Sequence, residues 1–514
     1  MLLYTKELVA PRAKLRQGLQ RFKAQPERQK YKLLFSSTFD HSTIHGVHNA
    51  FVEQYLWVRL FWLLVVLLAT VGFLIMFAML DHHHNEQLLV SVVETTQLPI
   101  YSVDFPAIAI CPWNHVNWMR APTAAQRFLP KDATPELHEV FRQLLISMEH
   151  QLFGRFDGLG DLIKYNLTGL EQLSLSKLTN YMAYRCDELF MPGSCVFDET
   201  SYDCCQLFLY EQTEWGTCMV FNSLISEDSR KKQLINQFYP HKLSTAGEDS
   251  GLEFTLRLNQ SFMRPGNRLN FSVGLMIKQP KQWTISTVYA LYENTETFIA
   301  VDPLVMEVTP NTHELHPSQR RCYLEHEHQL YFPAKALLYS RQNCIATCRQ
   351  WNVLQHCKCI MPQYLPVIDG ARECSVLDLD CIYRNAGIFS LVKMEGQDKY
   401  INDSLRGMEC KCINSCNTQQ YYILMNVREI KHVNGINVTK LQKRIKTRIY
   451  FGQRVMTKIQ TKRKYTYHDW MASFGGILGL YIGASALSFG ELASVLIKLL
   501  WMLLRQGYAK IKPN

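Results

Sequence analysis

The residues whose types could bind a cation lie near the C-terminus, within an apolar run at about 473–504. Gly483-Ala484-Ser485 combines small residues with a hydroxyl, and it is followed by Ser488 and by the carboxylate of Glu491. Ala484, Ser488 and Glu491 are spaced i, i+4 and i+7, so they share one face of a helix. A carboxylate is costly in lipid, so that face should look into a bundle interior or a water-filled path. The pattern predicts a pore helix; the alternative is a membrane anchor with a stray glutamate.

The rest of the chain shows no pattern typical of catalysis. No nucleophile elbow, phosphate loop or paired-carboxylate motif stands out. The run at 81–84, Asp-His-His-His, is expected in a solvated loop, because three adjacent histidines cannot all face one ion from a regular element. We therefore expect no enzyme, no metal site and no cofactor, apart from a permeant ion and N-glycans.

Membrane helices must position the candidate pore residues. The run 473–504 is long enough to cross a bilayer, and residues 57–80 meet the same test with Arg59 as their single charge. Gly475, Gly479 and Gly483 recur every four residues, which gives the second helix a flat face for close packing. Two spans place both termini on one side, and residues 1–56 carry nine Lys/Arg against four Asp/Glu. The positive-inside rule puts that side in the cytoplasm.

The expected organisation is that of a multi-pass membrane protein. It has a cytoplasmic tail (1–56), a first span (57–80), an extracellular domain (81–472), a second span (473–504) and a cytoplasmic tail (505–514). All 16 cysteines fall between Cys111 and Cys416, and an even number confined to one presumed outside region indicates disulfides. Zinc is the weaker interpretation, because the x1 spacing of Cys357-x-Cys359 and Cys410-x-Cys412 is poor for zinc.

The net charge of +10 is concentrated in one segment. Residues 428–464 contain twelve Lys/Arg and one acidic residue. A basic run can indicate nucleic acid or anionic lipid. Here Ile445, Thr447 and Ile449 alternate with Lys446 and Arg448, which predicts a strand with one solvated face. Such a segment outside the second span should make the outer mouth of a pore less attractive to cations.

Several motifs occur in an order that points to a known family. Ser42-Thr43-x-His45-Gly46 precedes the first span, residues 105–112 read Phe-Pro-Ala-Ile-Ala-Ile-Cys-Pro, and residues 216–222 read Gly-Thr-Cys-Met-Val-Phe-Asn. Gly483-Ala484-Ser485 then precedes Leu-Ser-x-x-Glu at 487–491. Together they resemble the degenerin and epithelial sodium channel family over most of the chain, and Cys186, the Cys204-Cys205 pair and the short tails look most like its insect pickpocket branch. Met219 stands where that family usually has tyrosine.

The resemblance implies a fold, an activity and site residues. The fold is α+β: two transmembrane helices flank a large disulfide-rich extracellular domain with a β-sheet palm and peripheral helices, as in acid-sensing channels. The activity is that of a trimeric, voltage-independent, amiloride-sensitive sodium channel subunit in the plasma membrane, with a sensory or epithelial role. The implied selectivity filter is Gly483, Ala484 and Ser485, and Ser488 and Glu491 line the pore. The implied gating residues are His45, Gly46 and Ala472.

The resemblance also supplies a disulfide pairing. It joins Cys111 to Cys218, Cys322 to Cys416, Cys344 to Cys412, Cys348 to Cys410, Cys357 to Cys381 and Cys359 to Cys374. The four other cysteines are expected to pair among themselves, as Cys195 with Cys204 and Cys186 with Cys205. Glycosylation sequons lie at Asn166, Asn259, Asn270, Asn402 and Asn437.

Two alternatives belong to other classes of protein. An ATP-gated receptor channel also has two spans and a cysteine-rich outer domain, but it would lack His-Gly before the first span and Gly-x-Ser in the second. A non-conducting accessory or receptor subunit that assembles with related channel subunits is compatible with every motif. Expected partners are the lipid bilayer and copies of this chain or its relatives, with no nucleic acid.

Overall fold

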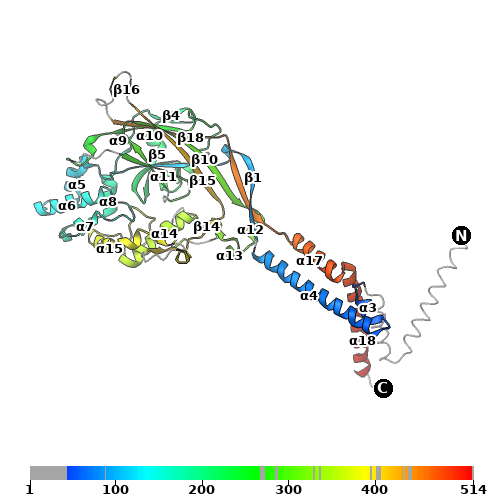
Figure 1. Cartoon of the computed structure of the whole chain (residues 1–514). Helices are drawn as coiled ribbons and strands as arrows, with labels where there is room; N and C mark the ends of the chain where they lie inside the picture. Colours follow the sequence, from blue (N-terminus) through cyan, green and yellow to red (C-terminus); the bar gives the residue numbers. More distant parts are fainter. Residues whose placement is uncertain are drawn as a thin grey trace. The chain divides into compact units, whose positions relative to one another are not determined.

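A computed structural model describes most of the chain and divides it into two compact units (Figure 1). One unit comprises residues 1–90 and 463–514, and the other residues 91–462. The described residues are 43–86, 88–266, 272–283, 287–327, 330–334, 337–393, 396–400, 407–430, 432–433, 436–437 and 443–511. The N-terminal tail before Thr43 and the sequons at Asn270 and Asn402 lie outside them.

The first unit consists of helices. They are α3 (Val47–Val52), α4 (Leu56–Glu86), α17 (Tyr467–Ile482) and α18 (Ala486–Ile511). Aromatic rings join α4 to α17: Phe77 lies 5.7 Å from Phe474 and 6.3 Å from Trp470, centroid to centroid. Gly72 of α4 leaves room for Tyr481, because a Cβ atom at Gly72 would lie 2.6 Å from the tyrosine ring.

One described helix is long and apolar enough by itself to cross a membrane. It runs from Leu56 to Asn85 with a mean hydropathy of 2.9 in its most apolar window. Helices Tyr467–Ile482 and Ala486–Trp501 meet the same criterion only when taken together, and they are bent by 74° at the break between them. The described residues therefore hold one such helix, or two if the bent pair counts as a single span.

The expectation of a solvated loop at 82–84 was wrong. The helix α4 continues through these histidines, and His83 and His84 lie in its last turn. His83 Nε2 lies 2.9 Å from the hydroxyl of Tyr465, which is close enough for a hydrogen bond. Histidines are favourable in this position because they can interact with the unpaired carbonyls at a helix C-terminus.

The second unit is built on a large mixed sheet. Its strand order is β1-β19-β10-β18-β7-β3-β4, with β15 also paired to β10. The long strand β10 (Thr295–Val308) lies antiparallel to β15 (Thr418–Glu429) and parallel to β18 (Lys443–Phe451) and β19 (Val455–Arg463). The other members are β1 (Leu89–Pro99), β7 (Leu252–Leu258), β3 (Cys195–Phe197) and β4 (Thr200–Tyr202).

A second sheet packs against the first through a shared apolar core. Its order is β5-β6-β2-β8-β9, comprising β5 (Phe208–Thr213), β6 (Gly216–Phe221), β2 (Ala107–Pro112), β8 (Ser272–Lys278) and β9 (Val288–Tyr292). All six residues of β2 are buried, as the apolar run at 105–112 suggests. Phe105, Phe221 and Phe254 belong to one core cluster that draws on both sheets.

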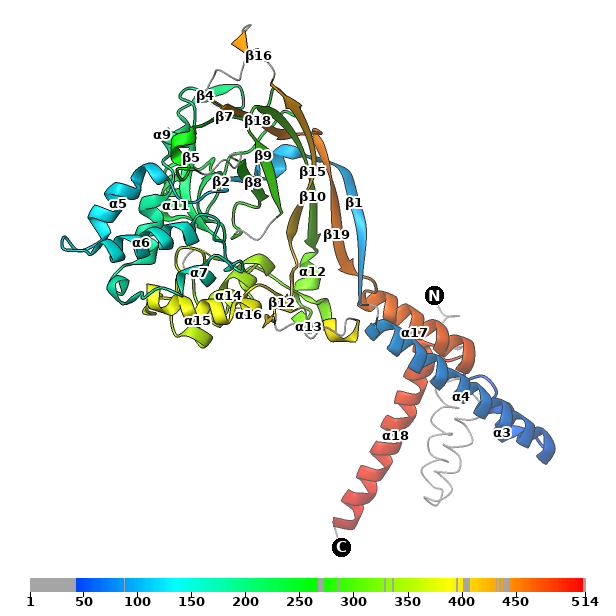
Figure 2. The ribbon, with the colours of Figure 1, turned by 60° about the vertical axis from the view of Figure 1, so that its left-hand side comes forward.

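Helices gather to one side of the strands within this unit (Figure 2). The main ones are α5 (Ala121–Phe128), α6 (Pro135–Met148), α8 (Leu175–Met182), α14 (Arg341–Cys357) and α15 (Leu379–Arg384). They enclose a core of their own that includes Phe141, Leu144 and Phe389. α11 (Glu227–Ile235) follows β6.

Short elements complete the unit. They are η1 (Ile100–Ser102), η2 (Trp118–Arg120), α7 (Leu159–Leu162), η3 (Thr168–Leu170), α9 (Cys186–Leu189), α10 (Cys204–Leu207), η4 (Gln260–Phe262), α12 (Pro310–His313), α13 (Pro317–Arg320), β11 (Cys322–Tyr323), η5 (Val376–Asp378), α16 (Ala386–Phe389), β12 (Val392–Lys393), η6 (Gln397–Lys399), β13 (Met408–Glu409), β14 (Asn414–Ser415), β16 (His432–Val433) and β17 (Ile436–Asn437).

All cysteines of the chain form disulfides in this unit, and the pairs are the eight given in the sequence analysis. They are Cys111–Cys218, Cys186–Cys205, Cys195–Cys204, Cys322–Cys416, Cys344–Cys412, Cys348–Cys410, Cys357–Cys381 and Cys359–Cys374. Helix α14 carries three of these cysteines and is therefore tied at several points to the segment 381–412. Such cross-links stabilise a fold largely by restricting the unfolded chain.

The basic segment 428–464 includes the strands β18 and β19, and carboxylates on neighbouring strands pair with both. Ile445, Thr447 and Ile449 are fully buried on one face of β18. On the other face, Lys446 and Arg448 lie 3.0 and 2.8 Å from the Glu253 carboxylate of β7. Lys458 in β19 is similarly bound to Glu94 and Glu307, at 3.1 and 3.0 Å. The charge excess in the sequence is thus partly neutralised across the sheet.

Candidate functional site

The candidate site is the break between α17 and α18. Residues 483–485 separate the two helices, so the continuous helix expected over 473–504 is interrupted where the filter residues lie. Ala484 is therefore outside both helices, and the predicted i, i+4, i+7 face from Ala484 to Glu491 was wrong at its first member. Ser488 and Glu491 are helical, three residues apart on α18.

The sequence itself supplies the caps that end one helix and begin the next. Gly483 has φ +70° and ψ 17°, a left-handed conformation that favours glycine, and its N–H donates to the carbonyl of Gly479. Ser485 then caps the start of α18. Its hydroxyl accepts from Ser488 N–H at 3.4 Å, and the Ser488 hydroxyl accepts from Ser485 N–H at 3.0 Å. Such reciprocal bonds satisfy backbone groups that have no partner at a helix start.

The His45-Gly46 pair packs directly on this break. The His45 N–H donates to the carbonyl of Ile482, with N and O 3.1 Å apart. The His45 ring covers Gly483 so closely that a Cβ there would lie 2.3 Å from its Cγ atom. Gly46 has φ +77°, and a Cβ atom there would lie 2.9 Å from Val66 of α4. Two glycines thus allow the segment before α3 to fit between α4 and the break.

Thr43 links the same segment to the two polar residues of α18. Its Oγ1 lies 2.8 Å from Ser488 Oγ and 2.9 Å from Glu491 Oε2. The Ser488 side chain is buried, whereas Glu491 is exposed. The structure therefore brings Thr43 together with Ser488 and Glu491, which lie 445 and 448 positions further along the chain.

The other residues predicted from the sequence have these surroundings. Ala472 is exposed in α17. Cβ atoms placed at Gly475 and Gly479 would meet nothing within 4 Å, so no described part of the chain packs on this glycine face. Asn166 and Asn259 are exposed, as glycosylation would require. Asn437 lies in β17.

Sequence reasoning missed two partners at the site. Thr43 is part of the motif that contains His45 and Gly46, but a threonine at this position gives no signal in the sequence of a contact with Glu491. The second is Tyr481, whose ring needs the space at Gly72. A lone glycine in an apolar helix gives only a weak signal for such a contact, although small residues do mark close approach between helices.

Oxygen atoms gather at the break. Residues 483–485 lie outside both helices, next to the hydroxyls of Thr43 and Ser488 and the carboxylate of Glu491. Carbonyl, hydroxyl and carboxylate oxygens are ligands that hard cations prefer. Among the described residues, no group of three or more His, Cys, Asp or Glu side chains could hold a metal ion.

Comparison with known proteins agrees with this arrangement. Residues 38–495 match the amiloride-sensitive sodium channel family. The chain belongs to that family. The match confirms the resemblance drawn from the motifs, and it spans both the His45-Gly46 segment and the helix break of this sodium channel family member.

Curated relatives place the chain among pickpocket proteins of this family. Pickpocket protein 19 of Drosophila melanogaster is 52% identical over 513 residues, covering 100% of this chain and 99% of the relative. Pickpocket protein 11 of the same organism is 23% identical, covering 90% and 75%. Epithelial sodium channel subunit gamma-2 of Xenopus laevis is 23% identical, covering 64% and 48%.

A solved structure of a proton-activated chloride channel aligns over 86% of this chain and 97% of that chain. Its TM-score is 0.28 at 7% identity, which is too low to support an argument.

Proposed function

We propose that this chain is a subunit of a trimeric, voltage-independent, amiloride-sensitive cation channel that prefers sodium. In this proposal, α4 and the α17–α18 pair are two membrane spans, both termini are cytoplasmic and residues 91–462 are extracellular. The channel lies in the plasma membrane and has a sensory or epithelial role. Family membership supports the class of activity, and the break at Gly483-Ala484-Ser485 supports the location of the pore.

The observation that carries the proposal is the break between the two helices at residues 483–485, held by the Gly483 cap and by the His45 ring. Three copies of this segment around an axis would bring carbonyls and hydroxyls together at one narrow level, where they could replace water around a cation. Three Glu491 carboxylates beyond that level would concentrate cations and repel anions.

The same contacts suggest how the N-terminal segment takes part in gating. Thr43 and His45 touch the break from the side of α3, so a movement of this segment would change the polar groups at Ser488 and Glu491. In the proposal the segment is therefore part of the pore wall.

A second candidate is a non-conducting accessory subunit that assembles with relatives. The names of several relatives contain the word subunit, as in epithelial sodium channel subunit gamma-2, which favours assembly of this chain with related chains.

Recording current from cells that express this chain alone, and then together with a related subunit, separates the two candidates. Surface labelling in both cases ensures that absence of current does not reflect absence of protein. The channel proposal predicts amiloride-sensitive sodium current in at least one condition that Glu491→Gln reduces. If co-expression gives current that neither Ser485 nor Glu491 substitutions alter, the accessory role is correct.

A further inference from the structure

A pocket of about 760 Å³ opens between two helices of the second unit, far in sequence from the helix break. One wall is a stripe of residues from η2 and α5, Trp118, Ala121 and Ala125. The facing wall is a stripe from α6, where Phe141 and Leu145 are one turn apart. The loop at 264–266 closes a third side. Pockets of roughly 300–1,000 Å³ suit small organic ligands.

The pocket is hollow because small residues face large ones across it. Ala121 and Ala125, four positions apart on α5, present only methyl groups. The facing wall with Phe141 and Leu145 is itself part of the helical core, because these side chains have only 2% and 1% of their surfaces exposed. An apolar molecule seated here would therefore bury surface against a wall that is already ordered.

The polar side chains that line the pocket belong to basic residue types. Arg142 and Arg264 line it together with His138, and none of the described lining residues is acidic. The Arg142 guanidinium donates to both carboxylate oxygens of Glu139, at 2.8 and 2.7 Å, on the exposed side of α6. Arg264 lies 3.6 Å from Glu149, whose carboxylate already accepts a 2.6 Å hydrogen bond from Trp118 Nε1. A guanidinium in such a long contact keeps most of its five donors for another acceptor.

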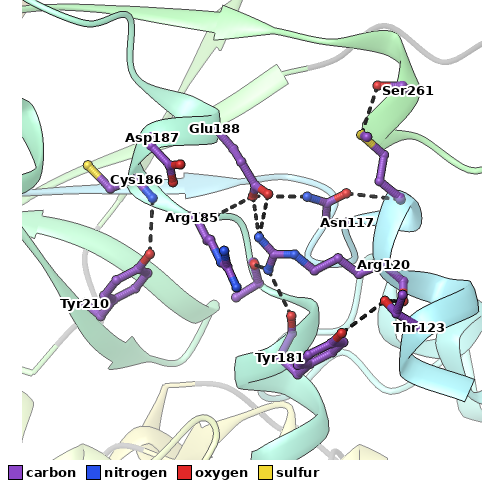
Figure 3. Close-up of polar contacts among 12 residues, drawn as sticks. Asn117, Arg120, Thr123, Tyr181, Arg185, Cys186, Asp187, Glu188, Tyr210 and Ser261 are labelled. Atoms are coloured by element: carbon purple, nitrogen blue, oxygen red, sulfur yellow. Dashed lines mark hydrogen bonds and ion pairs between the residues drawn. The ribbon is translucent and has the colours of Figure 1, made fainter. Parts of the chain in front are cut away.

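A polar network fixes the wall that carries Trp118 and Ala121 (Figure 3). The Arg120 guanidinium donates to both carboxylate oxygens of Glu188 at 2.6 Å and to the carbonyl of Tyr181 at 2.9 Å. The Asn117 amide donates to the same Glu188 carboxylate at 3.1 Å, while its carbonyl accepts from the N–H of Met119. Asn117 before Trp118 and Arg120 two residues after it are thus anchored before any ligand binds, which lowers the entropic cost of binding.

We propose that this pocket binds a small organic anion with an apolar body, its anionic group at Arg264 and its body between α5 and α6. Two features of the pocket set the ligand class. The apolar walls favour a body of aromatic or aliphatic carbon, and the donors that Arg264 keeps open favour a carboxylate or similar group over a neutral one. The site lies outside the segment that we assign to the pore, so the proposal does not depend on the proposed function.

The test measures binding of 2-naphthoate to the full-length protein in nanodiscs, with 2-naphthamide as its uncharged counterpart and empty nanodiscs as the blank. Saturation-transfer NMR and calorimetry both report binding without requiring current. The expected result is at least tenfold tighter binding of the acid than of the amide. Ala125→Phe, which fills the pocket, should abolish binding of both compounds.

Charge and shape are separated by matched variants. Arg264→Gln should bring the affinity for the acid down to that for the amide. Arg127 lies on the same helix as Ala125 but outside the pocket lining, so Arg127→Gln should change neither the affinity for the acid nor that for the amide. If Ala125→Phe does not fold, as judged by thermal unfolding, Ala121→Val serves as the filling variant. Equal binding of acid and amide to the wild type, or undiminished binding in a folded filling variant, would overturn the proposal.

Discussion

Gly483 meets two requirements that no other residue type meets together. Its φ of +70° ends α17, and its missing side chain leaves room for the His45 ring. A side chain in the left-handed conformation costs roughly 1–2 kcal/mol, and here it would also displace the ring. The spacing of glycines in the sequence suggested a packing face instead, and Gly483 alone of the three serves as a cap.

Gly483→Ala should therefore destabilise the helix break and the His45 contact. We expect a lower melting temperature of the purified protein, measured by intrinsic fluorescence, and an altered current per channel at the surface. Gly476→Ala is the matched control, because a Cβ there would meet nothing within 4 Å and alanine suits a helix interior. Equal effects of the two substitutions would mean that the break does not depend on the conformation of Gly483.

Glu214, which is buried, and His115, which is half-buried, should make the stability of the second unit depend on pH in opposite senses. Burial raises the pKa of the Glu214 carboxyl to about 7, although Arg349 partly offsets this. Burial lowers the pKa of His115 to about 4, and the nearby His150 contributes. The Glu214 contribution to stability is present below about pH 4.5 and is lost as pH rises through 7. The His115 contribution is present above about pH 6.5 and is lost as pH falls through 4.

Glu214→Gln should remove the gain in stability on going from pH 7 to pH 4.5. One pKa unit corresponds to about 1.4 kcal/mol, so the change in this pH slope should be on the order of 2–3 kcal/mol. Unfolding of the full-length protein by denaturant at several pH values measures it, with Glu171→Gln as control because Glu171 is exposed. A slope identical to that of the wild type would show that Glu214 is ionised throughout this range in the folded protein.

At the scale of elements, α14 is the helix of the second unit that three disulfides attach to the rest of the fold. Cys344 and Cys348 lie one turn apart on its buried face and bond to Cys412 and Cys410, which follow the short strand β13. Because the bonds are parallel, loss of one leaves a free thiol beside an intact neighbour. The buried face of α14 also includes the polar residues Asn343 and Gln350. We therefore expect α14 to depend on its disulfides more than on apolar packing.

Cys348→Ser should strongly reduce delivery of the protein to the cell surface. It opens a loop of 62 residues, a change worth about 2–4 kcal/mol, and frees the thiol of Cys410. Surface biotinylation gives the readout. Asn166→Gln and Asn402→Gln, which remove glycan sites without touching a disulfide, should matter little. Normal trafficking of Cys348→Ser would contradict a role for the disulfides in folding.

Elements with a repeating pattern of apolar residues could be predicted from the sequence. The prediction was wrong where a local cap interrupts a helix inside such a pattern. Alternation at 445–449 indicates β18 correctly, since burial on one face of a strand is periodic. The apolar run 473–504 indicates one helix, but the backbone bonds of Gly483 and Ser485 divide it. The basic character of 428–464 suggested a strand with one solvated, positively charged face. The pairing of its side chains with Glu253 and Glu307 could not be predicted, because it depends on the order of strands in the sheet. Contacts between Thr43 and Glu491 likewise depend on tertiary structure alone.

At the scale of the whole molecule, Ala472 tests whether copies of α17 meet near an axis. It is exposed in the single chain, one turn before Gly476. In the proposed trimer a bulky side chain there would penalise a closed arrangement more than an open one, because packed interfaces tolerate added volume poorly. A difference of about 1.4 kcal/mol between the two states would shift their ratio tenfold.

Ala472→Phe should therefore give current without a stimulus, blocked by amiloride-type compounds, and toxicity to the expressing cell. Whole-cell recording with and without the blocker measures it. The matched control is Ala472→Ser, which changes the same position but adds little volume. A silent Ala472→Phe protein that reaches the surface and still opens to its stimulus would show that this position faces lipid or water.

The central claim is that the break at residues 483–485 selects the permeating ion, and the reversal potential of the current tests it most directly. Ser485→Thr adds one methyl group while keeping the hydroxyl that begins α18. Under opposing sodium and potassium gradients, we predict a reversal potential shifted toward potassium, because the ring of oxygen ligands is resized. An unchanged reversal potential in an assembly that carries current would contradict the assignment of this segment as the filter.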